Sequence, residues 1–211
     1  MKYIVWDWNG TLLDDVPVCV AVMNGMLERR GLPVLTVERY REIFTFPVEG
    51  YYRAAGLDLE REAFPVLAEE YITEYNRRAL GCGLYPGAVE TLARMEALGY
   101  TQLLVSASQR QALAEQVAGC GVGGWFRAVL GIGDYLAVGK AGLAGAYLQE
   151  QGAAPADALF VGDTLHDWEV AAGLGCRCVL VAGGHQSVER LRQSGAVVVA
   201  GIGMLERAIS L

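Results

Sequence analysis

The sequence predicts an α/β protein with a doubly wound parallel sheet, interrupted after its first strand by an inserted α-helical cap. From Gly87 onward, short apolar runs alternate with helical patterns, the spacing of a parallel sheet covered by helices on both faces. Residues 15–83 show helical patterns only. We therefore expect an α/β core formed by residues 1–14 and 84–211, and a helical cap formed by residues 15–83.

The first strand and the cap helices follow from local signals. A short apolar run predicts a buried first strand, Tyr3-Ile4-Val5-Trp6. Gly and Pro residues then separate successive helical patterns. The cap helices are expected over Val16–Arg30, from an N-cap at Thr36 to Ile43, over Val48–Ala55 and over Leu59–Leu80.

The remaining elements alternate regularly after Gly87. Helices are expected over Ala88–Leu98, Gln109–Ala118, Ala141–Gln151, Trp168–Leu174 and Val188–Gln193, with a short helix at the end of the chain. Strands are expected over Thr101–Val105, Ala128–Gly131, Ala158–Val161, Arg177–Val181 and Ala196–Val199. Because the strands are parallel, their carboxyl ends all lie at one edge of the sheet, where ligands bind in open α/β folds.

Composition narrows the class of protein. The chain has 211 residues, 53% of them apolar, which suits one sheet domain with an insert. A net charge of −7 argues against nucleic acid as a partner. No apolar run approaches the roughly 18 residues that a membrane span needs, and no signal-peptide pattern opens the chain. We expect a cytoplasmic protein with reduced cysteines that binds neither nucleic acid nor membrane; its oligomeric state is open.

Chemically capable side chains stand where the predicted strands end. Asp7, Ser106 and Asp163 each follow a predicted strand, Lys140 stands just before a helical pattern, and Asp167 lies about one helical turn after Asp163. Singly, each has a structural explanation, such as a helix-capping acid or a solvated lysine. Together they favour phosphoryl transfer, because a carboxylate can be the nucleophile and carboxylate oxygens suit Mg²⁺.

The same segments resemble the motifs of the haloacid dehalogenase-like hydrolase superfamily. The matching residues are, in order, Asp7-Trp8-Asn9-Gly10-Thr11-Leu12, Ser106, Lys140 and Gly162-Asp163-Thr164-Leu165-His166-Asp167. The resemblance covers essentially the whole chain, and is to the phosphoglycolate-phosphatase-like branch with an inserted helical cap. It implies a Rossmann-like core and a Mg²⁺-dependent phosphatase that acts on a small phosphorylated metabolite through an aspartyl-phosphate.

This resemblance also implies which residues hold the metal ion and attack the substrate. Asp7 is the implied nucleophile. The implied Mg²⁺ ligands are the side chains of Asp7 and Asp163 and the backbone carbonyl of Asn9. Asp167 would stand beside the metal site and orient its water or Lys140.

Other residues of the motifs are implied to contact the phosphoryl group. Lys140 would place a positive charge on a phosphoryl oxygen, and also assist Asp7. Ser106 and the backbone N–H of Ala107 would donate hydrogen bonds to the other oxygens. Thr11 belongs to the same phosphate-binding loop, whose shape it would help to hold.

Asn9 departs from the family pattern, in which an Asp protonates the leaving oxygen and later activates water. An amide cannot transfer a proton in this way, and such acid–base help is worth about 10² to 10⁴-fold. We therefore expect low activity on alkyl phosphates or a preference for good leaving groups. The alternatives are a weakened relative that binds a phosphorylated ligand or a protein partner, another reaction such as phosphonate cleavage, and an introduced Asp-to-Asn change.

Several aromatic residues are candidates for contacts with the substrate. In the cap these belong to the segments Phe46-Pro47 and Tyr51-Tyr52-Arg53, although the helical spacing of the aromatic residues is more typical of packing. His166 is expected at the rim of the site, and is the first residue to test as a substitute proton donor.

Overall fold

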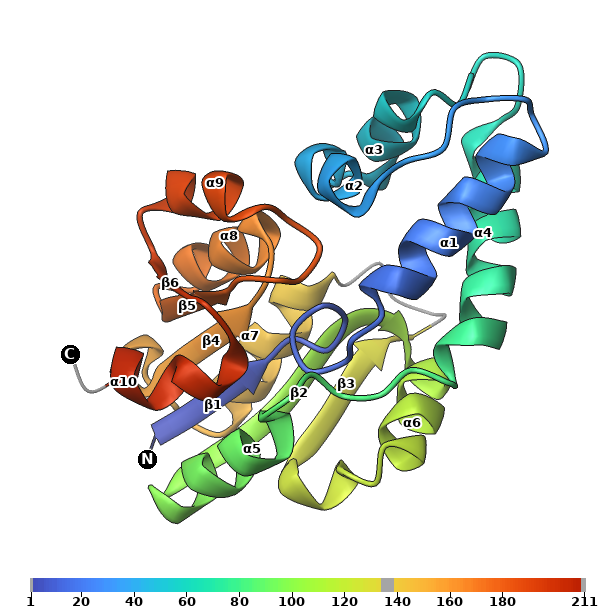
Figure 1. Ribbon diagram of the computed structural model, residues 1–211. Helices are drawn as coiled ribbons and strands as arrows, with labels where there is room; N and C mark the ends of the chain where they lie inside the picture. Colours follow the sequence, from blue (N-terminus) through green and yellow to red (C-terminus); the bar gives the residue numbers. More distant parts are fainter. Residues whose placement is uncertain (1, 134–138, 210–211) are drawn as a thin grey trace.

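The computed structural model describes residues 2–133 and 139–209 and confirms the predicted α/β fold class (Figure 1). Within these residues, six parallel strands form one sheet in the order β3-β2-β1-β4-β5-β6. The strands are β1 (Lys2–Trp6), β2 (Tyr100–Gln109), β3 (Ala128–Ile132), β4 (Ala158–Gly162), β5 (Arg177–Val181) and β6 (Val197–Val199).

The central strand β1 fixes the position of the functional edge. Trp6 pairs with Leu104 of β2 on one side and with Val161 of β4 on the other. The strand order reverses its direction at β1, because β2 and β3 lie on one side and β4 to β6 on the other. A crevice forms beyond the carboxyl ends of the strands at such a switch point. Asp7, which follows β1, therefore stands at the start of this crevice.

Helices cover both faces of the sheet. The helices α5 (Ala88–Ala97), α6 (Arg110–Gly119) and α10 (Leu205–Ile209) pack on one face, and α7 (Lys140–Glu150) and α8 (Leu165–Gly173) on the other. The short helix α9 spans Val188–Leu191. Successive side chains of β1 enter opposite layers: Ile4 and Trp6 join the first hydrophobic cluster, Tyr3 and Val5 the second.

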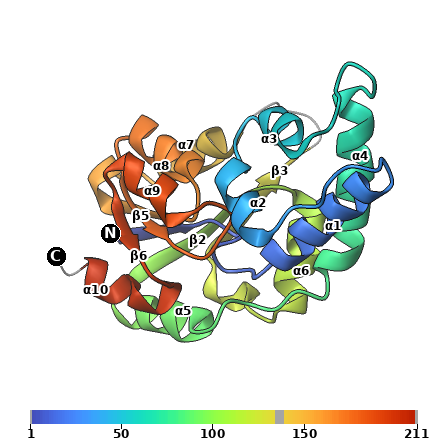
Figure 2. The same cartoon turned by 45° about the horizontal axis from the view of Figure 1, so that its top comes forward.

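Four helices lie between β1 and α5 in the chain, namely α1 (Val16–Glu28), α2 (Val37–Ile43), α3 (Val48–Ala55) and α4 (Phe64–Ala79). Figures 1 and 2 place them together beyond the carboxyl ends of the strands. They have a hydrophobic cluster of their own, which includes Met23, Tyr51 and Leu67.

The two connections between these helices and the sheet run side by side. Leu13 forms an antiparallel bridge with Leu84, and the Asp14 N–H donates to the Gly83 carbonyl over 2.9 Å. Residues 15–83, all of which are described, contain no strand. These features support the division at residues 14/15 and 83/84, which stays a prediction for an independent cap domain.

Three elements begin or end three or more residues away from their expected positions. Helix α4 begins at Phe64 instead of Leu59, because the Asp58 side chain accepts two backbone N–H groups and holds a turn there. Helix α8 begins at Leu165 instead of Trp168, because Thr164 starts a capping box. Strand β2 continues through Ser106 to Gln109, with a register shift after Val105, so Ser106 lies within the strand.

The rest of the structure adds two plain observations. All five cysteines are free. No helix in the described part of the chain has the length and apolar character of a membrane span.

Candidate active site

The loop after β1 folds tightly around a glycine. Three successive backbone N–H groups, those of Thr11, Leu12 and Leu13, donate to the Trp8 carbonyl. Gly10 adopts a φ of 72°, and a Cβ there would lie 2.4 Å from the Asp163 carboxylate and 2.5 Å from the His185 ring. Only glycine fits such a position. Its lack of a side chain lets the loop approach the residues that follow β4 and β5.

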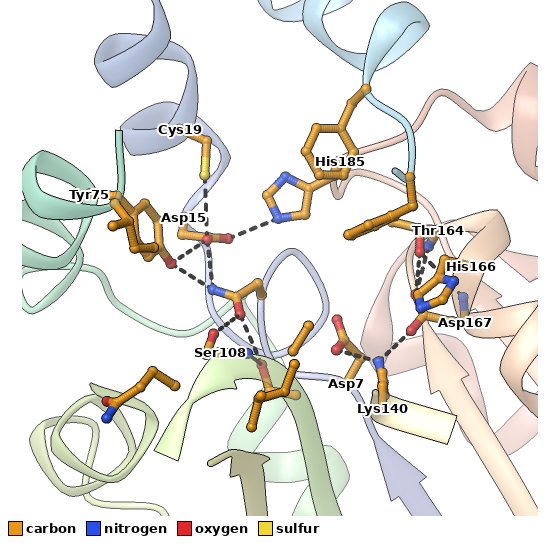
Figure 3. A pocket seen from close by; sticks show the side chains of 18 of the residues that line it. Asp7, Asp15, Cys19, Tyr75, Ser108, Lys140, Thr164, His166, Asp167 and His185 are labelled. Atoms are coloured by element: carbon orange, nitrogen blue, oxygen red, sulfur yellow. Dashed lines mark hydrogen bonds and ion pairs between the residues drawn. The ribbon is translucent and has the colours of Figure 1, made fainter. Parts of the chain in front are cut away.

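Four residues expected to act together meet at this edge of the sheet (Figure 3). Carboxylate oxygens of Asp7, Asp163 and Asp167 all lie within 4.8 Å of one another. The Lys140 ammonium donates to Asp7 Oδ1 over 2.5 Å and to Asp167 Oδ1. Asp167 turns its other oxygen to the N–H and hydroxyl of Thr164, over 3.0 and 2.7 Å, in the capping box of α8. The N-terminus of α8 therefore orients the Asp167 carboxylate, which in turn binds Lys140.

This cluster carries more negative than positive charge. Burial raises the pKa of Asp7 to about 8, and Asp167 and Asp163 add to this, although Lys140 opposes it. Burial likewise raises the pKa of Asp163 to about 6. Burial would lower the pKa of Lys140, but Asp167 and Asp7 outweigh it and raise that pKa. Two buried carboxylates, those of Asp163 and Asp167, and the partly buried carboxylate of Asp7 thus lie around a single ammonium group.

An oxygen-only set of ligands with excess negative charge fits a hard divalent cation such as Mg²⁺. Asp7 and Asp163 present carboxylates to the common space. No hydrogen bond within the described residues uses the Asn9 carbonyl, so it is available as a ligand. Both carboxylate oxygens of Asp167 accept hydrogen bonds, one from Lys140 and the other from Thr164. Asp167 is therefore suited to lie beside the ion and to orient Lys140.

The Thr11 hydroxyl contacts two of the three carboxylates. Its hydroxyl donates to Asp163 Oδ1 over 2.8 Å and lies 3.5 Å from Asp7 Oδ2. Thr11 is fully buried and is not among the residues that line the cavity. The hydroxyl therefore positions Asp163, and the assignment of Thr11 to the phosphate-binding residues stays a prediction.

Asn9 uses both ends of its amide. Its Oδ1 accepts from the hydroxyls of Ser106 and Ser108, over 3.2 and 2.9 Å. Its Nδ2 donates to Asp15 Oδ2 over 2.9 Å and to the Tyr75 hydroxyl over 2.6 Å. A carboxylate at position 9 could not donate, and it would face the carboxylate of Asp15. The surroundings are therefore matched to an asparagine.

A second buried group, absent from the sequence prediction, adjoins Asn9. Asp15 Oδ1 accepts from the Gly10 N–H over 2.9 Å and lies 3.4 Å from His185 Nε2. His185 Nδ1 lies 2.8 Å from the Tyr40 hydroxyl. The backbone N–H of His185 donates to Asp163 over 2.6 Å. This group therefore connects the cap helix α2 to the loop that follows β5.

The ion pair of this group remains charged although it is buried. Burial would lower the pKa of His185, but Asp15 outweighs it and raises that pKa to about 9. Burial would raise the pKa of Asp15, but His185, Tyr75 and Asn9 hold it below its usual value. The available sequence signals were that His185 is one of only two histidines and follows Gly183-Gly184 after a strand, and that Asp15 follows Asp14.

These groups border a cavity of about 420 Å³ between the sheet edge and the cap. Ser106 and Ala107 line it on the core side, as does His166, whose ring centroid is 4.8 Å from that of Phe46. The apolar part of the lining comes chiefly from the cap, and Ile132 of β3 adds to it from the core side. The cap residues are Tyr40, Phe44, Phe46, Tyr71, Ile72 and Tyr75. Tyr51 and Tyr52, the other aromatic candidates, do not line the cavity and are buried in the cap cluster.

Known proteins resemble this chain in sequence and in fold. A family model described as haloacid dehalogenase-like hydrolase matches residues 4–181. Phosphoglycolate phosphatase 1 of Pseudomonas aeruginosa is 26% identical over 210 residues, with 94% of this chain and 75% of that protein covered. Phosphoglycolate phosphatase of Pectobacterium atrosepticum is 28% identical over 206 residues, with coverages of 94% and 88%.

The fold has close counterparts among solved structures. A haloacid dehalogenase-like hydrolase from Streptococcus pneumoniae superimposes with a TM-score of 0.84 at 17% identity, with 99% of this chain and 98% of that chain covered. This likeness extends over the cap helices as well as the sheet. The chain belongs to the haloacid dehalogenase-like hydrolase family, and its similarity to phosphoglycolate phosphatases confirms the branch that its motifs predicted.

Proposed function

We propose that the protein is a Mg²⁺-dependent phosphatase that hydrolyses a small phosphate monoester through a phosphoenzyme on Asp7. The observation that carries this proposal is the contact of Lys140 with both Asp7 and Asp167, next to Asp163, at the carboxyl edge of the sheet. The similarity to proteins named phosphoglycolate phosphatase supports the reaction class.

Asp7 would attack the phosphorus atom with a carboxylate oxygen, so that the O–P bond to Asp7 forms as the ester P–O bond breaks. The leaving group would depart as its oxyanion and take a proton from solvent water. Lys140 holds Asp7 in place and offsets the negative charge that gathers as the substrate enters. Mg²⁺, held by Asp7, Asp163 and the Asn9 carbonyl, would neutralise charge on the phosphoryl oxygens. Electrostatic positioning of this kind is the main need in phosphoryl transfer.

The remaining phosphoryl oxygens would meet the end of β2. Ser106 and Ala107 line the cavity beside Asn9. We assign them as donors to the phosphoryl group, with the Ser106 hydroxyl turning from Asn9 to the substrate. Residues 15–83 would act as the cap that excludes water during the reaction, hinged near Asp14–Pro17 and Gly81–Pro86.

Asn9 determines which substrates turn over fastest. Its amide has no proton to give the leaving oxygen, and both of its ends are engaged. Esters with good leaving groups should therefore react best, and water should attack the phosphoenzyme slowly. Asn9 also favours a second candidate function, a protein that binds a phosphorylated ligand without turning it over.

Phosphate release from 4-nitrophenyl phosphate, with and without Mg²⁺, tests the proposal. We expect Mg²⁺-dependent release that Asp7→Asn lowers at least about 10³-fold, because no nucleophile remains. Asp157→Asn is a matched control, since Asp157 precedes β4 at the opposite end of the sheet. Near wild-type release by Asp7→Asn, or full activity in chelator, would overturn the proposal. Binding without release would favour the second candidate.

A further inference from the structure

The cap side of the cavity exposes large apolar side chains. Phe46 is 39% exposed and Ile72 is 47% exposed, and both line the cavity. Phe46 lies in the α2–α3 connection, with Phe44 5.5 Å away in ring-to-ring contact, whereas Ile72 lies on α4. Apolar surface that converges on a cavity from two elements has a natural partner in an apolar part of the ligand.

The apolar cap side of the cavity, called the wall below, includes Tyr40, Tyr71 and Tyr75. The hydroxyl groups of two of these tyrosines already form hydrogen bonds within the protein, so the wall presents mainly aromatic rings. The Tyr75 hydroxyl donates to Asp15 and accepts from Asn9, over 2.7 and 2.6 Å. The Tyr40 hydroxyl is paired with His185. Tyr71 stacks on Tyr75 with ring planes 7° apart. The polar ends of Tyr40 and Tyr75 are therefore already engaged within the protein.

The positive groups of the cavity are engaged as well. Among the described residues that line it there is no arginine, and the candidates for positive charge are Lys140, His166 and His185. Lys140 is held by two carboxylates and His185 by Asp15. His166 lies 3.6 Å from Glu169. Residues 134–138, which are not described, contain neither lysine nor arginine in the sequence.

A carboxylate on the leaving group would therefore meet no uncommitted cation. It would instead enter a space lined by aromatic rings and by uncharged polar groups such as the amides of Asn76 and Gln109, with Asp15 and Asp7 nearby. Burying an unpaired charge is costly, so such a substrate should bind poorly. A phosphorylated hydroxy acid of the kind named for the relatives is thus a poor match to this wall.

We propose that the leaving group of the natural substrate is an uncharged aromatic alcohol, so that the substrate is an aryl or arylalkyl phosphate monoester. The ring would lie against Phe46 and Ile72, with the phosphoryl group at Asp7. The cavity of about 420 Å³ is large enough for one ring and its phosphate. This inference rests on the proposed phosphatase function and adds the substrate class to it.

A comparison of benzyl phosphate, butyl phosphate and phosphoglycolate tests the class of leaving group. All three release an alkoxide, so the comparison separates recognition by the wall from the ease of leaving. We expect kcat/KM for benzyl phosphate to exceed that for phosphoglycolate at least about tenfold, with butyl phosphate between them. An equal or higher kcat/KM for phosphoglycolate would overturn the inference.

The same assay distinguishes this failure from failure of the proposed function. Hydrolysis of 4-nitrophenyl phosphate together with a preference for phosphoglycolate would leave the phosphatase standing and remove only the aromatic substrate class. No hydrolysis of any of these esters, with or without Mg²⁺, would overturn both.

A pair of variants tests whether the wall itself sets the preference. Ile72→Arg places a guanidinium in the cavity, whereas Val66→Arg places one on the same helix outside it, at a side chain that is 59% exposed. We expect Ile72→Arg to shift the kcat/KM ratio toward phosphoglycolate about tenfold. Val66→Arg should leave the ratio unchanged, with circular dichroism showing both variants folded. An unchanged ratio in a folded Ile72→Arg would contradict the inference.

Discussion

Two buried polar groups adjoin each other at the carboxyl edge of the sheet and differ in their charge balance. The carboxylate cluster consists of Asp7, Asp163, Asp167 and Lys140, with three acids against one base. Burial and mutual repulsion raise the pKa of Asp7 to about 8 against the pull of Lys140. The carboxylate cluster therefore has an excess of negative charge, which a bound cation would neutralise.

The neighbouring cap-facing group consists of Asn9, Asp15, Tyr40, Tyr75 and His185. Here one acid meets one base, and hydroxyl and amide groups satisfy the remaining oxygens. Asp15 and His185 therefore both keep their charges. We infer that the deficit of positive charge marks the expected place of metal and phosphoryl chemistry, whereas the balanced group positions its neighbours.

Removal of Lys140 should have the largest effect. Lys140→Met leaves Asp7 and Asp167 facing each other without a cation, and we expect a loss of about 10³-fold in kcat. Without metal, the free energy of unfolding at pH 8 should also fall by about 3 kcal/mol. Phosphate release and urea unfolding measure these effects. The matched control is Lys2→Met, which removes the only other lysine in the sequence. Equal behaviour of the two variants would refute the role of the cluster.

Exchange of the acid within the cap-facing group, between positions 9 and 15, should have the next largest effect. Asn9→Asp alone sets a carboxylate against Asp15, whereas Asn9→Asp combined with Asp15→Asn restores one donor and one acceptor. We expect the double variant to raise kcat on alkyl phosphates about 10²-fold and the single variant to raise it less, with far smaller changes on aryl phosphates. Steady-state kinetics on both substrate types measures this. Equal gains on both types would mean that another group supplies the proton, with His166 tested first.

Magnesium should distinguish the two groups in the absence of substrate. At a Mg²⁺ concentration 100 times its dissociation constant, the wild-type protein should gain about 2.7 kcal/mol in free energy of unfolding. Asp163→Asn should lose this gain and Asp15→Asn should keep it, because only the carboxylate cluster has charge to neutralise. Thermal or urea unfolding with and without Mg²⁺ gives the answer. A gain that depends on Asp15 would place the ion in the cap-facing group.

The smallest effect concerns pH. Because the folded pKa of His185 is raised to about 9 from 6.5, its charge stabilises the fold fully below pH 6.5 and this contribution is lost as pH rises through 9. Between pH 6.5 and 9.5, the wild-type protein should lose on the order of 2 kcal/mol more unfolding free energy than the double variant Asp15→Asn, His185→Asn. Urea unfolding at each pH, with chelator present to exclude metal ions, measures this difference. The titration of Asp7 cancels in the comparison, because Asp7 titrates in both proteins. Parallel pH profiles of the two proteins would show that the ion pair does not contribute to the stability of the fold.

Local signals predicted much of the fold. Helix α3 and strand β5 have the bounds expected from the sequence, Val48–Ala55 and Arg177–Val181. Gly56, with a φ of 107°, ends α3 where the sequence indicated. The motifs likewise predicted which strand-end residues come together, because parallel strands bring their carboxyl ends to one edge.

The cap-facing group lay beyond the reach of such signals. Asn9 and Tyr75 are 66 positions apart, and Tyr40 and His185 are 145 positions apart. Their contacts depend on how the cap sits on the sheet, which no short pattern encodes. The Thr11 hydroxyl likewise donates to Asp163, 152 positions away, a contact that its motif does not specify.

The central position of β1 has a consequence for how the chain folds during synthesis. The Trp6 indole N–H of β1 donates a hydrogen bond to the side chain of Gln102, 96 positions later. Thr11, in the loop after β1, donates to Asp163, which is synthesised later still. The cap helices, in contrast, are contiguous and have a hydrophobic cluster of their own. As the chain leaves the ribosome, we predict that the cap packs while β1 still has both edges unpaired. Nascent chains that stall before β4 should therefore present an apolar strand beside a folded cap, and such chains should depend most on chaperones.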